Sequence, residues 1–210
     1  MKLLILLLIT LTSGFCSAAG DRITTEQEPL ILVLGDSLSS GYGIDADKSW
    51  VSLLGQRLME KSFRYQLINA SISGNTTING LNQLGALLQQ YKPDIVIIEL
   101  GGNDGLRGLS LQSMQRNLSE MISLCHQSNA RVALAGIKIP PNYGKRYTEA
   151  FYNVYPQLAK QHNVTLIPFL LDDVGDNSQL MQSDGLHPTA KAQAIILENV
   201  WPYLLGLLEK

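Results

Sequence analysis

The sequence predicts an α/β domain built on a parallel sheet with helices on both faces. Short apolar runs alternate with longer segments whose apolar residues recur at helical spacing. This alternation is typical of strand–helix–strand units, which join parallel strands. Three of the runs are nearly continuous in apolar residues, as expected of strands that are covered on both sides. A chain of 210 residues, 45% of them hydrophobic, is long enough for one large core.

Five runs qualify as strands, and five strands fit a doubly wound order of the flavodoxin type. The expected strands are 30–34, 65–68, 94–100, 132–135 and 164–167. Helical spacing predicts helices near 48–62, 76–91, 110–128 and 145–162, and a last helix after Pro188. Pro156 and Pro202 each interrupt a helical pattern, so we expect a kink or a break at both.

The first 19 residues are typical of a secretory signal peptide. Lys2 precedes a short apolar stretch, and small residues occupy positions 17–20. That stretch is shorter than the roughly 20 residues that span a bilayer. Phe15 stands before Cys16 where a lipoprotein signal has a small residue, which argues against a lipid anchor. We expect a periplasmic or secreted protein without a stable membrane anchor, with a tail at 20–29 and one domain over 30–210.

Composition argues against several classes of protein. A formal net charge of −2, with no block of like charge, gives no basis for binding nucleic acid. After signal removal Cys125 is the only cysteine; it lies in a helical pattern and is expected in the core. Neither Gly-x-Gly-x-x-Gly nor a Walker motif follows a strand, which argues against a flavodoxin-type nucleotide or phosphate binder. We expect a monomer.

A serine directly follows the first expected strand, in the sequence Gly35-Asp36-Ser37-Leu38. Near the other end of the chain, Asp184 precedes His187 by three residues. Acyl transfer needs a nucleophile, a base and a group that orients the base, and these three residues can supply them. Chance gives Gly-Asp-Ser-Leu in about one chain of this length in two hundred, but Asp-x-x-His in about one in four. The serine motif therefore carries most of the weight.

Two glycine-containing turns offer donors for an oxyanion. Gly74 follows the second expected strand, and Asn103 follows the third. Each alone is an ordinary strand-to-helix turn, where Gly and Asn are common. Ligands of doubly wound sheets bind beyond the carboxyl ends of the strands, where Ser37 is also expected. Their shared position favours an oxyanion hole, in which one donor is worth about 10²–10³ in rate.

These segments, in this order, resemble the SGNH (GDSL) hydrolase superfamily, which is named for a serine, a glycine, an asparagine and a histidine. The matching residues are Ser37, Gly74, Asn103 and His187, and Asp184 completes the triad. The resemblance extends from about residue 30 to the final helix. The stretches 35–42, 101–105, 139–144 and 181–188 look like the periplasmic thioesterase I/protease I/lysophospholipase L1 subgroup.

The resemblance implies a three-layer flavodoxin-like fold, with no metal and no cofactor. It implies an oxyanion hole from the backbone amides of Ser37 and Gly74 and the side chain of Asn103. Asp36 is implied to be a structural hydrogen-bonding partner. The implied activity is broad hydrolysis of acyl thioesters, lysophospholipids and simple esters.

In the subgroup, the loop that corresponds to 105–110 moves over the bound acyl chain. Gly105 would serve as a hinge, while Leu106 and Leu109 would contact lipid. Ile139 and Pro140, in another subgroup stretch, complete the expected substrate-binding residues. The same segment is equally consistent with a plain connecting loop.

The leading hypothesis is therefore a serine esterase and thioesterase that forms an acyl-enzyme on Ser37 and acts on small-molecule or lipid acyl substrates. One alternative is a carbohydrate O-deacetylase on the same fold, which an apolar acyl tunnel would argue against. Another is a catalytically silent lipid-binding protein, against which the full set of catalytic positions argues.

Overall fold

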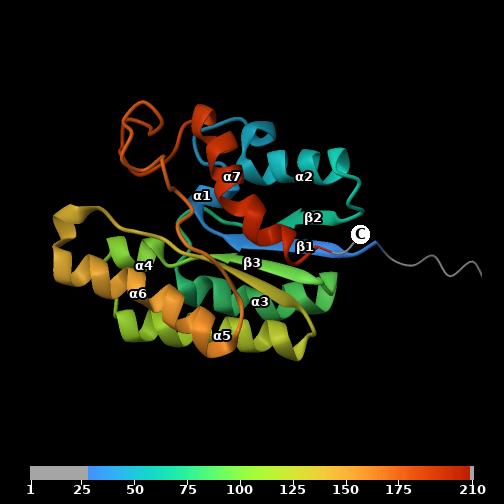
Figure 1. Ribbon diagram of the computed structural model, residues 1–210. Helices are drawn as coiled ribbons and strands as arrows, with labels where there is room; N and C mark the ends of the chain where they lie inside the picture. Colours follow the sequence, from blue (N-terminus) through green and yellow to red (C-terminus); the bar gives the residue numbers. More distant parts are fainter. Residues whose placement is uncertain (1–27, 209–210) are drawn as a thin grey trace, which may run out of the picture.

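The computed structural model describes residues 28–208. The predicted signal peptide and most of the predicted tail lie outside the described residues. Five parallel strands form one sheet in the order β2-β1-β3-β4-β5 (Figure 1). This is the doubly wound order, so the predicted fold class is confirmed. The strands are β1 (Leu30–Gly35), β2 (Gln66–Asn69), β3 (Ile95–Glu99), β4 (Arg131–Ala135) and β5 (Thr165–Ile167).

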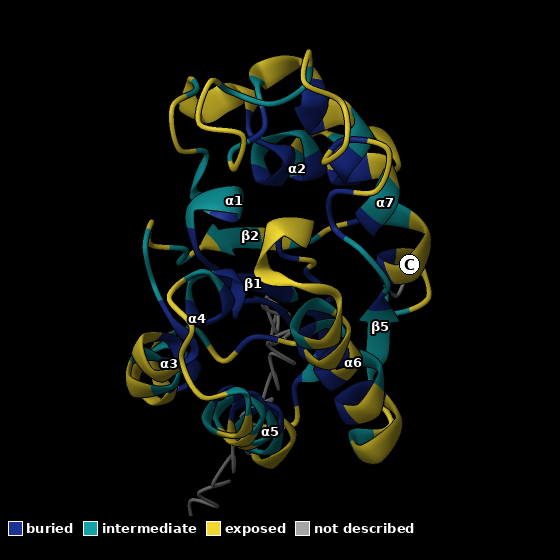
Figure 2. Cartoon of the chain, turned by 90° about the vertical axis from the view of Figure 1, so that its left-hand side faces the viewer, coloured by how far each residue is buried: buried dark blue, intermediate teal, exposed yellow. Residues whose placement is uncertain are grey.

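Helices cover both faces of the sheet and give three layers, with α2 and α7 on one face and α3, α5 and α6 on the other (Figure 2). The long helices are α2 (Trp50–Glu60), α3 (Thr77–Tyr91), α5 (Leu111–Gln127), α6 (Lys145–His162) and α7 (Gln193–Leu205). Between residues 28 and 208, no helix is long and apolar enough to cross a membrane.

Short helices mark the carboxyl edge of the sheet. The helix α1 (Ser37–Ser40) follows β1, and α4 (Gly102–Leu106) follows β3. Figure 2 looks onto this edge and places both helices beside the end of β1. The structure also has three short 3-10 helices between residues 28 and 208, namely η1 (Ala46–Lys48), η2 (Pro141–Tyr143) and η3 (Ala190–Ala192).

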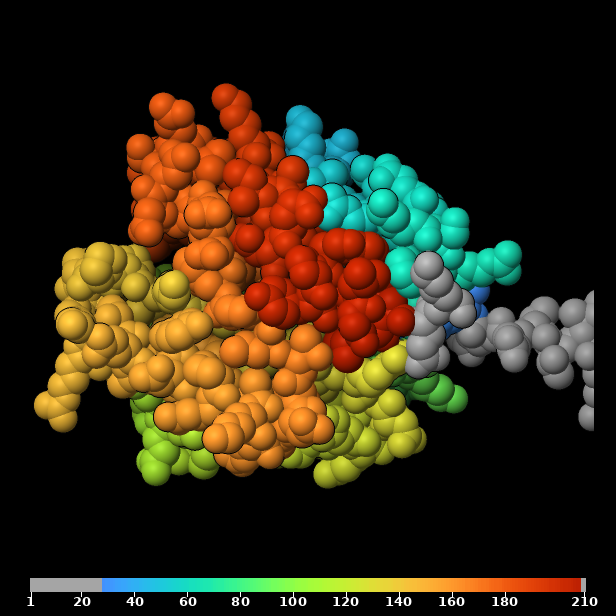
Figure 3. Space-filling view, viewed as in Figure 1, coloured from blue at the N-terminus to red at the C-terminus, as the bar shows by residue number. Residues whose placement is uncertain are grey.

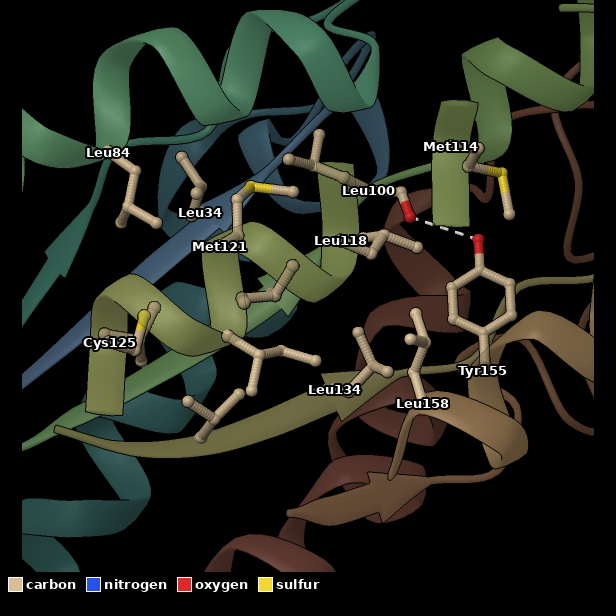
Figure 4. Close-up of a cluster of buried hydrophobic side chains, with 14 of the residues drawn as sticks. Leu34, Leu84, Leu100, Met114, Leu118, Met121, Cys125, Leu134, Tyr155 and Leu158 are labelled. Carbon is tan, nitrogen blue, oxygen red and sulfur yellow. Dashed lines mark hydrogen bonds between the residues drawn. The ribbon is translucent and has the colours of Figure 1, made fainter. Parts of the chain in front are cut away.

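Successive residues of the central strands enter two separate cores. In β1, Leu32 and Leu34 pack with α3 and α5, while Val33 packs with α2 and α7. This alternation follows from the pleat of a strand. Figure 4 shows the first core, where the Tyr155 hydroxyl donates to the Leu100 carbonyl at 3.1 Å. Because helices cover both faces of the sheet, we expect side chains that contact a substrate at the ends of the strands.

Neither Pro156 nor Pro202, where a kink or a break was expected, breaks its helix. Helix α6 continues through Pro156, and α7 continues through Pro202. A proline inside a helix costs about 3 kcal/mol relative to alanine. Tyr155 and Leu158 are buried around Pro156, as are Val200 and Leu204 around Pro202. We attribute the continuity of both helices to this packing, which outweighs the lost backbone bond.

Cys125 lies in α5 and is fully buried, as predicted for a core residue. Burial raises the pKa of its thiol to about 12. The thiolate is the nucleophilic form of cysteine, so this side chain has a packing role.

Candidate active site

Ser37, His187 and Asp184 form a continuous hydrogen-bonded row. The Ser37 Oγ lies 2.8 Å from His187 Nε2, and His187 Nδ1 lies 2.6 Å from Asp184 Oδ2. A carboxylate only accepts hydrogen bonds, so Nδ1 carries the ring hydrogen and Nε2 is left to accept from the serine. This is the order of nucleophile, base and orienting acid that the sequence predicts.

Ser37 is the first residue of α1, directly after β1. Asp36 caps this helix, because its Oδ1 accepts from the Leu38 backbone N–H at 3.0 Å. Gly41 ends the helix with a φ of +75°, a left-handed conformation that favours glycine. The caps at both ends of α1 therefore fix this short helix, and with it the Ser37 hydroxyl, at the edge of the sheet.

His187 stands on a turn that Asp184 itself stabilises. The Oδ1 of Asp184 accepts from the backbone N–H groups of Leu186 at 2.9 Å and His187 at 3.0 Å. Together with the imidazole bond, which contributes most, these donors lower the pKa of Asp184 to about 2. The carboxylate is therefore ionised at neutral and mildly acidic pH, as an orienting acid requires.

Asn103 lies within α4, so the expected turn after β3 is helical. Its Nδ2 donates to Asp36 Oδ2 and to the Asn75 carbonyl, both at 3.0 Å. Asn103 also lines the cavity beside Ser37. Both of its amide hydrogens are engaged, so a substrate oxyanion would have to share or replace one of these bonds. The oxyanion role of Asn103 stays a prediction.

Gly74 lies in the turn that follows β2, with a φ of +83°. Its carbonyl accepts from Arg107 at 3.0 Å, and the neighbouring Ser73 hydroxyl lies 2.8 Å from that of Ser40. These contacts tie the turn to α1 and to the end of α4. Gly74 does not line the cavity, so its role as an oxyanion donor also stays a prediction.

Two buried carboxyl groups lie next to α1. Glu99 Oε2 accepts from the Ser39 hydroxyl at 2.7 Å and from the Asp36 backbone N–H at 3.2 Å. Burial raises the pKa of Asp36 to about 6 and that of Glu99 well above its usual range. A Cβ at Gly35 would lie 2.6 Å from Glu99 Oε2, which explains the glycine of the serine motif.

Sequence reasoning missed Glu99, although an acidic residue inside an apolar strand was the available signal. Asp104, which lies in α4, caps a different helix, α3. It accepts from the backbone N–H of Thr77 at 2.8 Å and from its hydroxyl at 2.6 Å, at the start of α3. This contact joins the segment of Asn103 to the segment of Gly74.

A cavity of about 830 Å³ opens beside Ser37 and His187. The segment after β5 and the start of α6 border it, and both lie at the left-hand edge of Figure 3, in orange and gold. Its apolar lining includes Leu106, Ile137, Ile139, Pro140, Leu171 and Met181, and its polar lining includes Glu149, Asp172, Asp173, Asp176 and Asn177. Lys138 also reaches it, with Nζ 4.3 Å from the ring centre of Phe169. In the described part of the chain, no cluster of His, Cys, Asp or Glu is placed to hold a metal ion.

Three of the five expected substrate-binding residues line this cavity: Leu106, Ile139 and Pro140. Leu109 lies off it and is 43% exposed. Gly105 also lies off it, inside α4, so the expected loop does not begin there. A Cβ at Gly105 would lie 2.6 Å from the Phe151 ring, and the glycine therefore permits close packing in place of a hinge.

Sequence reasoning did not predict that the segment after β5 contributes to this site. Phe169, Leu171 and Met181 line the cavity. The signal was available, because residues after β5 belong to the same carboxyl edge as Ser37.

Fold and site together define this chain as a serine hydrolase of carboxylic acid derivatives. Residues 33–195 match the GDSL-like Lipase/Acylhydrolase family, and the chain belongs to that family. The resemblance to the SGNH (GDSL) hydrolases is confirmed.

Relatives with known names agree with this assignment. Esterase TesA of Pseudomonas aeruginosa is 49% identical over 178 residues, covering 85% of this chain and 89% of the relative. Thioesterase 1/protease 1/lysophospholipase L1 of Escherichia coli is 43% identical over 193 residues, covering 92% of this chain and 86% of the relative. The crystal structure of the psychrotrophic esterase EstA from Pseudoalteromonas, inhibited by monoethylphosphonate, superposes with a TM-score of 0.81 at 42% identity. That match covers 85% of this chain and 98% of EstA.

Proposed function

We propose that this protein is a periplasmic or secreted esterase and thioesterase that cleaves acyl chains through Ser37, His187 and Asp184. The observation that carries the proposal is the hydrogen-bonded row, with 2.8 Å from Ser37 to His187 and 2.6 Å from His187 to Asp184. A serine hydroxyl becomes an effective nucleophile only when a base can take its proton, and this row provides that base.

The reaction proceeds in two steps. The Ser37 Oγ attacks the acyl carbonyl carbon while its proton passes to His187 Nε2. The C–O or C–S bond then breaks, and His187 returns the proton to the leaving alcohol or thiol. Water attacks the acyl-enzyme, giving a proton to His187, which passes it back to Ser37 as the acid leaves. Asp184 holds the imidazole tautomer and stabilises the imidazolium.

The negative oxygen that develops in each step needs donors. The backbone N–H groups of Ser37 and Gly74 and the amide of Asn103 are the proposed set. Support comes from the contacts that link their three segments, between Asn103 and Asp36 and between Ser40 and Ser73. Donors fixed before the reaction stabilise a transition state without a cost of reorganisation.

The cavity lining favours an acyl chain over a sugar. Leu106, Ile139 and Met181 present apolar surface beside the serine, and each buried methylene of a chain contributes about 0.8 kcal/mol. The cavity also has polar side chains, among them Glu149 and Asp172, and the dependence on chain length distinguishes an acyl chain from a sugar. The names esterase, thioesterase and lysophospholipase among the relatives agree with the same substrate class.

The test is the chain-length dependence of ester hydrolysis, measured on p-nitrophenyl esters from acetyl to palmitoyl and on palmitoyl-CoA, beside Ser37→Ala. We expect a maximum at medium or long chains and a loss of at least about 10³-fold in Ser37→Ala. A maximum at acetyl would instead support the deacetylase. Activity that does not depend on Ser37 would overturn the proposal and leave a silent lipid-binding protein as the better account.

A further inference from the structure

We propose that Gln182 and Tyr42 are positioning residues that together hold His187 against Ser37. This inference rests on the proposed function, because it concerns how the base of that reaction is kept in place. Neither residue is a member of the triad, and neither lines the cavity. Their contacts nevertheless join the two segments that carry the nucleophile and the base.

The side chain of Gln182 bridges these two segments. Its Nε2 donates to the Tyr42 carbonyl at 2.9 Å and to the Pro188 carbonyl at 3.0 Å. Its backbone N–H donates to the His187 carbonyl at 2.7 Å. One residue therefore binds the backbone carbonyls of His187 and of the residue after it and, 140 positions away, the loop that follows α1.

Tyr42 makes the reciprocal connection. Its backbone N–H donates to the Ser37 carbonyl at 3.3 Å. Its ring packs on the His187 imidazole, with 4.5 Å between the ring centres and a tilt of 41°. The side chain is 53% exposed, so burial of this ring in a core does not account for its position. Its contact with the imidazole explains that position.

Gly43 leaves the space that this arrangement needs. A Cβ at Gly43 would overlap the amide group of Gln182, and its φ of +74° is itself a glycine conformation. The glycine thus permits the loop after α1 to lie directly against Gln182. A side chain at position 43 would displace the Gln182 amide from this place.

The bonds of Asp184 cannot replace this link. They end on Leu186 and His187, inside the same turn, so they orient the ring within the turn. They do not fix the turn relative to α1. A displacement of about 1 Å between reacting groups can cost about 10²-fold in rate. The 2.8 Å contact between Ser37 and His187 therefore depends on a connection between the segments.

The experiment compares Gln182→Met, Tyr42→Leu and Tyr42→Phe on p-nitrophenyl butyrate. We expect kcat to fall about tenfold or more in the first two variants, with KM within about twofold, because the base is displaced and the cavity is not. Tyr42→Phe keeps the ring and is expected to retain kcat within about twofold. Thermal unfolding of each variant shows whether the fold is intact.

Matched controls use the same substitutions elsewhere: Gln56→Met on α2 and Tyr203→Leu on α7, both at exposed positions. These should leave kcat unchanged. Wild-type kcat retained in Gln182→Met and Tyr42→Leu would overturn the proposal, as would a loss confined to KM. If the wild-type rate itself did not depend on Ser37, the proposed function would fail first, and the two failures are thereby distinguished.

Discussion

The hydroxyl of Ser37 lies 2.8 Å from Nε2 of His187, although 150 positions separate the two residues in the chain. The fold creates this contact by ending β1 at the same edge of the sheet that the turn before α7 crosses. The same edge holds Asn103 and the mouth of the cavity. The proposed catalysis therefore depends on how three distant segments are held together.

Asp184→Asn tests the orienting acid. Asparagine can present an N–H to the imidazole and so favour the wrong tautomer, in which Nε2 no longer accepts from Ser37. We expect kcat to fall about 10²–10⁴-fold with little change in KM. Steady-state kinetics on p-nitrophenyl butyrate measure this. Asp47→Asn, at an exposed position of η1, is the control and should leave both kcat and folding unchanged. A matching loss of kcat in this control would point to a general effect of charge.

Leu106→Ala tests the acyl site. The side chain lines the cavity, and removing it takes apolar contact from a long chain but not from an acetyl group. At about 25 cal/mol per Å² of apolar surface, we expect KM for decanoyl and longer esters to rise about tenfold. Leu109→Ala is the matched control, because Leu109 lies off the cavity. Equal effects of the two substitutions would contradict the assignment of the cavity as the acyl site.

The pair of leucines also shows where sequence reasoning stops. Leu106 and Leu109 look alike in the sequence, and both were expected to contact substrate. Only the end of α4, after Leu106, decides which of them faces the cavity. The strands, the long helices and the hydrogen-bonded arrangement of Ser37, His187 and Asp184 were predictable, because periodicity and local motifs encode them. The partners of Glu99, Tyr42 and Gln182 were not predictable, because each of these residues contacts residues 60 or more positions away.

The dependence of stability on pH tests the buried carboxyl group of Asp36. Its pKa rises from 3.8 to about 6 on burial. Between these values the folded state retains a proton that the unfolded state has released, so the free energy of unfolding falls as the pH rises. The contribution of Asp36 is about 1.4 kcal/mol per pH unit, or about 3 kcal/mol in all. Glu99, whose pKa is also raised by burial, acts in the same direction.

Urea unfolding of wild type and Asp36→Asn between pH 4 and pH 7 measures this contribution. The slope should be smaller in the variant, which cannot ionise at position 36. Asp184 does not interfere, because its lowered pKa of about 2 places its own contribution below about pH 4. Identical slopes in the two proteins would show that Asp36 ionises normally in the folded state. The variant should also lose activity, because an amide at position 36 places a donor against the Asn103 amide.

Two glycine-to-alanine substitutions are expected to change stability in opposite directions. Gly105 is buried in α4, and a Cβ there would lie 2.6 Å from the Phe151 ring and 2.9 Å from the Ile139 side chain. Overpacking of this kind costs about 1–3 kcal/mol. Gly85 lies on the exposed side of α3, with no atom within 4 Å of a Cβ. Alanine there should stabilise the protein by about 0.5–1 kcal/mol, because it restricts the unfolded chain. Urea unfolding of both variants measures the two effects, and stabilisation of similar size at both positions would show that helix propensity, not contact with Phe151, governs Gly105.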